Sequence, residues 1–98
     1  MAVSKITLSP RTRWHTTYST ISGTTSLAAG STVDITTAWD LTGRDVIGLV
    51  PMYAGNPKLV ITNLWTANNR ACFTVLNPTS STQTITHARA TIGVLYRA

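Results

Sequence analysis

The sequence has no glutamate, only three aspartates and a single cysteine, and 11% of its 98 residues are charged. Chemistry that needs a pair of carboxylates, as in glycoside hydrolysis, would have to rely on aspartates alone. The single Cys72 cannot form an internal disulfide bond, and its place between Ala71 and Phe73 in an alternating run favours a buried, unreactive thiol. The sequence therefore excludes a disulfide-stabilised scaffold and offers few groups for catalysis.

No catalytic or metal-binding pattern stands out among the titratable residues. His15 and His87 are the only side chains that titrate near neutral pH, and with Cys72 they do not show the spacing of zinc ligands. Asp40 and Asp45 lie in a turn-rich stretch and are interpreted as turn or cap formers. No glycine-rich phosphate loop precedes a helix. We therefore predict a protein that is not an enzyme and that holds no cofactor and no metal.

Long apolar runs are also missing. No stretch approaches the roughly 20 apolar residues of a membrane span, and the first 14 residues lack the apolar centre of a signal peptide. Lysine and arginine outnumber the acidic residues by 8 to 3, but they are scattered and do not alternate with aromatic residues on one strand. We expect synthesis in a host cytoplasm, no membrane insertion, no nucleic-acid partner, and weak attraction to acidic surfaces.

The residues that are abundant indicate β-structure. Threonine, which favours strands, supplies about a fifth of the chain. In the last third, two alternating runs flank a polar turn, and the second run ends the chain. One face of this closing run is expected to be buried, and it carries Ala88, Ala90, Ile92, Val94 and Tyr96. The pattern predicts a C-terminal strand that is paired within a sheet.

Further strands are expected over residues 14–21, 32–37, 45–51, 58–66 and 71–76. In the first of these, Trp14, Thr16 and Tyr18 share a face with Thr20, and neither face is purely apolar. The continuous apolar run over 45–51 predicts a central strand buried on both faces. Residues 22–31 are interpreted as two successive turns, 38–44 as a loop, 67–70 as a four-residue hairpin loop and 77–79 as a turn.

About six or seven short strands without any run of helical period predict an all-β fold, an antiparallel sandwich or jelly roll. A small, partly open barrel is the alternative. The sandwich domain is expected to cover residues 14–98. It would follow an extended N-terminal arm over residues 1–13, in which Ile6 and Leu8 could add an edge strand.

Four aromatic residues are candidates for binding. Trp39 and Tyr53 lie in expected loops, where they could form an exposed patch that contacts a ligand such as a sugar ring. Trp65 and Tyr96 lie on expected strands with apolar neighbours, which favours roles in the core or at a subunit interface.

Several stretches resemble small β-rich virion proteins of bacteriophages. They are the Ala-Gly-Ser turn before an alternating strand at residues 29–35, the Asn-Pro-Thr turn at 77–79 and the closing strand over 90–96. Such features recur in capsid decoration proteins and in the tips of tail or head fibres. The resemblance implies a β-sandwich that forms trimers or sits at a symmetry axis of a virion, without catalysis.

Within that class we expect a decoration or cement protein, because a fibre tip usually belongs to a longer chain with a shaft and this chain starts at its own Met1. It would bind the major capsid protein or another virion protein as a homo-oligomer, with a trimer favoured. Lys5, Arg11 and Arg13 are the expected contacts to the capsid. The alternative is a receptor-binding or lectin-like fibre-tip module, in which Trp39 and Tyr53 would contact carbohydrate on the host surface.

Overall fold

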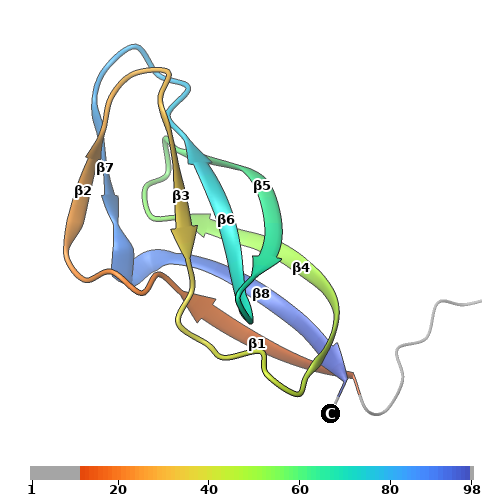
Figure 1. Ribbon diagram of the computed structural model, residues 1–98. Helices are drawn as coiled ribbons and strands as arrows, with labels where there is room; N and C mark the ends of the chain where they lie inside the picture. The colour runs from red at the N-terminus through yellow and green to blue at the C-terminus, as the bar shows by residue number, and fades with distance from the viewer. Residues whose placement is uncertain (1–11, 98) are drawn as a thin grey trace, which may run out of the picture.

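The fold is all-β and consists of three antiparallel sheets (Figure 1). The computed structural model describes residues 12–97. Its elements are β1 Thr12–Tyr18, β2 Thr24–Leu27, β3 Thr32–Thr36, β4 Asp45–Ala54, β5 Val60–Ala67, β6 Arg70–Leu76, β7 Gln83–Thr86, the 3₁₀ turn η1 His87–Arg89 and β8 Ala90–Arg97. The arm predicted over residues 1–13 lies outside the described residues except for Thr12 and Arg13, which begin β1.

The first sheet has the order β1-β8-β4, so the closing strand lies at its centre. The prediction of a paired C-terminal strand is therefore confirmed. The expected alternation is also confirmed in β8, where Ala90, Ile92 and Val94 are fully buried. The strand itself starts later than expected, because residues 87–89 form η1, and Ala88, which was expected on the buried face, is exposed.

Strand β4 differs from the expectation of a central strand that is buried on both faces. It lies at an edge of the sheet and continues to Ala54, and Ile47 and Met52 are about half exposed. The register against β8 shifts at these two residues, which marks them as β-bulges. A continuous apolar run was consistent with burial on both faces, but it is equally consistent with a strand whose outward side chains are apolar.

The second sheet has the order β3-β6-β5 and crosses in front of the first in Figure 1. The hairpin between β5 and β6 is tighter than the predicted four-residue loop, because Ala67 pairs with Arg70. Asn68 and Asn69 alone form the turn, with φ of 52° and 60°. Two left-handed central residues are typical of a type I′ hairpin turn, and asparagine tolerates that conformation better than most residues.

Strand β5 also contains a bulge, at Thr62, and this bulge changes which side chains point inward. The expected alternation put Ile61 and Trp65 on one face and Leu64 on the other. In the structure Ile61 and Leu64 both pack against the core, whereas Trp65 lies opposite Cys72 on the outward side. One extra residue in a strand reverses the face of every residue that follows it.

The third sheet pairs β2 with β7, and neither strand was among those expected by residue range. Residues 22–31 were interpreted as two turns, and β2 occupies the middle of this stretch. Leu27 is its only large apolar residue, so the alternation that signals a strand is absent. Only pairing with β7, which is distant in sequence, identifies the segment as a strand.

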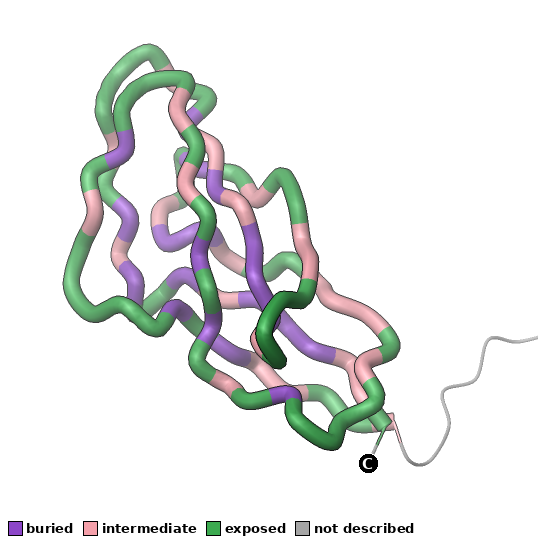
Figure 2. Tube along the Cα trace, in the orientation of Figure 1, coloured by how far each residue is buried: buried purple, intermediate pink, exposed green. Residues whose placement is uncertain are grey.

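One hydrophobic core joins the three sheets. It contains Ile92 and Val94 of β8, Phe73 and Val75 of β6, and Ile85 of β7, all completely buried (Figure 2). Buried polar side chains are hydrogen-bonded throughout residues 12–97, with none left unsatisfied. The core therefore holds the central strands in place, and the surfaces that remain available for binding lie at the sheet faces and at the loops.

Candidate functional site

The described residues include no group of three or more histidine, cysteine, aspartate or glutamate side chains that could hold a metal ion. Cys72 is buried and unpaired, as expected. His87 is also buried, at 1% exposure. Its Nδ1 lies 2.8 Å from Ser19 Oγ and its Nε2 lies 2.7 Å from Thr25 Oγ1. This pairing joins η1 to β2 and to Ser19, the residue that follows β1, and no substrate could reach the ring unless these segments separated.

Trp39 is the centre of an aromatic cluster, which we call the Trp39 stack. Its indole stacks on the imidazole of His15, with 3.7 Å between the ring centroids and 14° between the planes. The guanidinium of Arg44 lies 4.2 Å from the indole centroid, and the ring of Tyr96 meets the indole edge-on at 5.0 Å. Two planar groups at such distances cannot share one face, so His15 and Arg44 cover opposite faces of the indole. A sugar ring that stacks on Trp39 would first have to displace one of them.

The loop over residues 38–44 positions this stack. The backbone N–H of Trp39 donates to Thr17 Oγ1 of β1 at 3.2 Å. The Asp40 carboxylate accepts hydrogen bonds from the hydroxyl and the backbone N–H of Thr42, and it lies 3.2 Å from the Arg70 guanidinium. The Thr42 hydroxyl, its N–H and then Arg70 hold the pKa of Asp40 below its ordinary value. The loop is thus attached to both β1 and β6.

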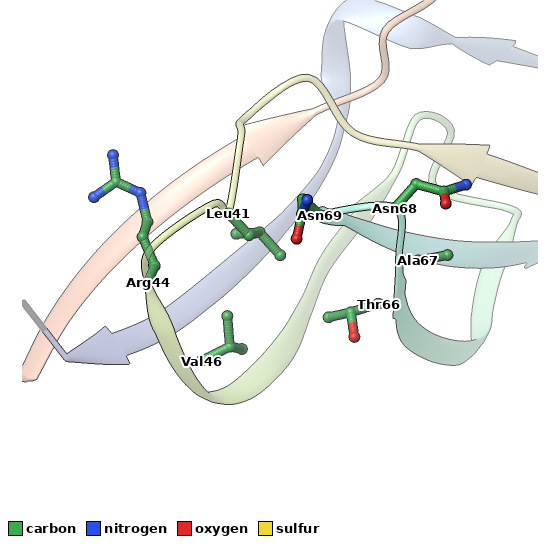
Figure 3. A pocket seen from close by; sticks show the side chains of 7 residues that line it. All are labelled: Leu41, Arg44, Val46, Thr66, Ala67, Asn68 and Asn69. Atoms are coloured by element: carbon green, nitrogen blue, oxygen red, sulfur yellow. The ribbon is translucent and has the colours of Figure 1, made fainter.

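A shallow hollow of about 400 Å³ lies beside this loop (Figure 3). Leu41 and Val46 line one side, and residues 66–69 of the β5-β6 hairpin line the other. The backbone N–H of Leu41 donates to the carbonyl of Asn69 at 2.8 Å, which joins the two sides. The head group of Arg44 points away from the hollow in Figure 3. The polar groups at the rim of the hollow are therefore the amides of Asn68 and Asn69 and the hydroxyl of Thr66. These groups can form hydrogen bonds but carry no charge.

Four arginines gather at this end of the molecule, which we call the arginine end: Arg13, Arg44, Arg70 and Arg97. Arg13 lies opposite Tyr96 in the sheet, and the Arg44 guanidinium is 5.3 Å from the Tyr96 ring. Two carboxylates accompany them, because Asp40 pairs with Arg70 and Asp45 lies 3.8 Å from Arg97. Among the side chains of residues 12–97, four positive charges against two negative ones leave an excess of two positive charges at this end.

A second surface is the outward side of the β1-β8-β4 sheet, which we call the outer face. Its residues are Trp14, Thr16 and Tyr18 of β1, Thr91, Gly93 and Leu95 of β8, and Ile47, Val50, Met52 and Tyr53 of β4. Trp14 lies across Gly93, and its indole N–H donates to Thr16 Oγ1 at 3.2 Å. The same hydroxyl lies 3.8 Å from Met52 Sδ, so β1 and β4 are in contact above β8. Most of these side chains are apolar.

The structure brings together some of the residues selected from the sequence and separates others. Trp39 and Tyr96 are in contact, although different roles were expected for them. Tyr53 lies opposite Thr91, five residues before Tyr96 along β8, which is about 17 Å away and on the other face of the sheet. Trp39 and Tyr53 therefore do not form one patch.

The other selected residues are also dispersed. Trp65 lies on β5 in a different sheet from Tyr96. Arg13 is exposed on β1, and Lys5 and Arg11 lie outside the described residues. Apart from Tyr53, the sequence interpretation missed the residues of the outer face. The one feature of the sequence that indicated the outer face was the alternation that put Trp14, Thr16 and Tyr18 on the same side of a strand.

No protein-family model matches this chain, and neither the curated proteins nor the solved structures compared with it give a match. Within residues 12–97, none of the helical structure is long or apolar enough for a membrane-crossing helix. The arginine end and the outer face are therefore the two candidate binding surfaces of this domain.

Proposed function

We propose that this protein is a virion structural protein without catalytic activity, a capsid decoration protein that binds the capsid surface as a homo-oligomer, with a trimer favoured. We further propose that its two three-stranded sheets are the layers of a small β-sandwich. The shared core supports that classification, because β8 and β6 each contribute completely buried side chains to it. The resemblance of the sequence to small phage virion proteins supports the choice of partner.

The observation that carries the proposal is the arginine end. Arg13, Arg44 and Arg97 gather near the start of β1, where Thr12 lies opposite Arg97. The residues before Thr12, which include Lys5 and Arg11, are joined to the domain at this same end. Positive charge is thus concentrated where the chain enters the fold, although the basic residues are scattered along the sequence.

Such an end suits an acidic protein surface. A guanidinium forms bidentate hydrogen bonds with a carboxylate, and complementary charge accelerates the encounter between two proteins. Exposed charges separated by more than about 10 Å are largely screened at 0.1 M salt, so binding through this end should weaken as salt is added. The outer face, which is nearly uncharged, would remain available for contacts between copies.

The first experiment asks whether the chain is part of a virus particle. Particles purified on a density gradient from cells that produce the protein are analysed by quantitative mass spectrometry. The proposal expects this chain to remain with the particles, at a fixed copy number relative to the major capsid protein. Particles that lack the chain, or from which it washes away at low salt, would refute the proposal.

A second experiment tests the arginine end with purified chain and particles stripped of it. Arg13→Glu should weaken binding, whereas Arg89→Glu makes the same charge change in η1 and should bind like the unmodified chain. Removal of residues 1–11, which leaves β1 intact, should also weaken binding. Equal effects of Arg13→Glu and Arg89→Glu would show that net charge, and not this end, determines binding.

A further inference from the structure

We infer that the outer face of the β1-β8-β4 sheet binds a second copy of this chain. Sequence reasoning assigned the subunit interface to Trp65 and Tyr96, but Tyr96 is engaged by the Trp39 stack. Four of the described large apolar side chains are instead exposed on the outer face, Trp14 at 48%, Tyr18 at 53%, Ile47 at 47% and Met52 at 48%. Of the described residues, the second three-stranded sheet exposes Val60 of β5 alone, at 43%. The inference concerns the surface through which copies meet, and its observations do not depend on the virion proposal.

The exposed apolar area fits an interface. Aromatic side chains bury about 150–250 Å² each when covered, so the exposed halves of Trp14 and Tyr18 together offer on the order of 200 Å². Ile47 and Met52, also about half exposed, add a comparable area. A standard interface buries about 800 Å² per partner, of which somewhat more than half is apolar. The outer face therefore supplies about the apolar area that one side of such an interface needs.

The charge distribution favours a second copy of the chain, and not an acidic protein, as the partner of the outer face. None of the residues that define the outer face is charged, and the charged strand residues next to it on the same side of the described sheet are Arg97 and Asp45, which form an ion pair at one end. An acidic partner would gain little by docking there, because the excess positive charge lies at the arginine end. A second copy of this face is equally neutral and apolar. Two chains of net charge +5 can thus meet on it without bringing like charges together at the contact.

The shape of the face is also suited to sheet packing. The Trp14 ring lies over Gly93, and Thr16, which pairs with Gly93, contacts Met52, so the centre of the face is filled and not hollow. Two sheets that pack face to face interdigitate side chains over a spacing of about 10 Å. Under two-fold symmetry the same residues would then be covered on both copies, whereas in a trimer the outer faces of three copies would turn toward one axis and their contacts would be heterologous.

The test is the solution mass of the full chain, measured by light scattering at high micromolar concentration. The inference expects a small multiple of 10.5 kDa for the unmodified chain. Tyr18→Lys and Met52→Lys each place a charge on the outer face and should reduce the mass to that of the monomer. Thr62→Lys introduces the same charge at an exposed position of β5, in the other sheet, and should leave the oligomer intact.

Circular dichroism confirms that each variant is folded, and either face variant alone is sufficient if the other fails to fold. A monomeric unmodified chain would overturn the inference. So would an oligomer that survives both face variants, or one that Thr62→Lys dissociates. A final measurement at high salt should leave the mass unchanged, because apolar contacts are not screened. Dissociation by salt would show that charges hold the copies together and would also overturn the inference.

Discussion

The indole of Trp14 occupies the space above Gly93 that a side chain would otherwise fill. A Cβ atom built on Gly93 would lie 2.2 Å from both Cζ2 and Cη2 of Trp14. No other residue type at position 93 is compatible with the observed position of the ring. Because Trp14 is half exposed, the ring can move away from the sheet, so a change at this glycine should displace the side chain and not unfold the domain.

We therefore expect Gly93→Ala to cost about 1 kcal/mol of unfolding free energy and to weaken self-association, because the displaced ring disrupts the outer face. Tryptophan fluorescence should shift to the red, and the solution mass should fall. Gly48→Ala is the matched control, since nothing lies within 4 Å of its added Cβ. It should gain about 0.5 kcal/mol, because glycine is unfavourable in a strand. Unchanged emission and mass in Gly93→Ala would contradict the assignment.

The closing strand shows what can be predicted from the sequence of this chain. Its apolar residues alternate over Ala90, Ile92 and Val94, and all three are buried as that pattern requires. The bulges show what cannot. Nothing in the composition around Thr62 marks an extra residue, so the inward positions of Ile61 and Leu64 follow only from the register against β6. Local alternation predicts a strand, whereas its faces depend on a partner that is distant in sequence.

The outer face and the Trp39 stack also depend on partners that are distant in sequence. Alternation alone placed Trp14 and Tyr18 on one side of a strand, but a continuous surface exists only because β8 and β4 lie beside β1. The Trp39 stack likewise joins a loop to β1 and β8. Such long-range pairings carry no local signal, which is why sequence reasoning interpreted Trp39 and Tyr96 separately.

Gly55 is expected to be the most sensitive glycine to substitution. A Cβ there would lie 2.9 Å from both the Thr86 carbonyl oxygen and Ile85 Cγ2, and its φ of 86° is left-handed. Backbone atoms of β7 cannot move as the ring of Trp14 can, so Gly55→Ala should cost about 2–4 kcal/mol in urea unfolding. Gly43→Ala isolates the backbone strain, because its φ is 75° with open space around the Cβ, and should cost about 1 kcal/mol. Equal losses would show that the contact with β7 does not matter.

Asn77 is the second position where a substitution should be severe, although the sequence suggested only a turn there. Its side chain is completely buried, and its amide group donates to the carbonyls of Leu27 and Ser81 at 2.9 and 2.8 Å. Its carbonyl oxygen accepts from the N–H and the hydroxyl of Thr79. The amide thus joins the end of β2 to the turn between β6 and β7.

Asn77→Asp should cost about 2–4 kcal/mol, because a carboxylate would face two carbonyl oxygens without a proton to donate. Thermal or urea unfolding measures the loss. Asn63→Asp is the control, since Asn63 is exposed and its side-chain oxygen accepts from the Leu64 N–H, which aspartate can also do. That variant should stay within about 0.5 kcal/mol of the unmodified chain. A comparable loss in both variants would mean that added negative charge, and not the buried amide, is responsible.

Asp40 should make the stability of the domain fall in acid. The hydroxyl of Thr42, its N–H and the Arg70 guanidinium lower the pKa of this carboxyl below the ordinary value of 3.8. As the pH falls, the unfolded chain takes up a proton at Asp40 before the folded chain does. The contribution of Asp40 is therefore complete above the unfolded pKa and is lost as the pH falls through the lower folded pKa.

The urea midpoint of the unmodified chain should accordingly drop more than that of Asp40→Asn between about pH 6 and about pH 3. Thr42→Val removes the hydroxyl and keeps the N–H, so its drop should lie between the other two. This order follows from the causes of the pKa shift, because the hydroxyl of Thr42 contributes most to it. If Thr42→Val behaves like the unmodified chain, the hydroxyl is not the main cause. If Asp40→Asn falls as steeply as the unmodified chain, other groups control the acid response and the loop over residues 38–44 does not depend on this carboxylate.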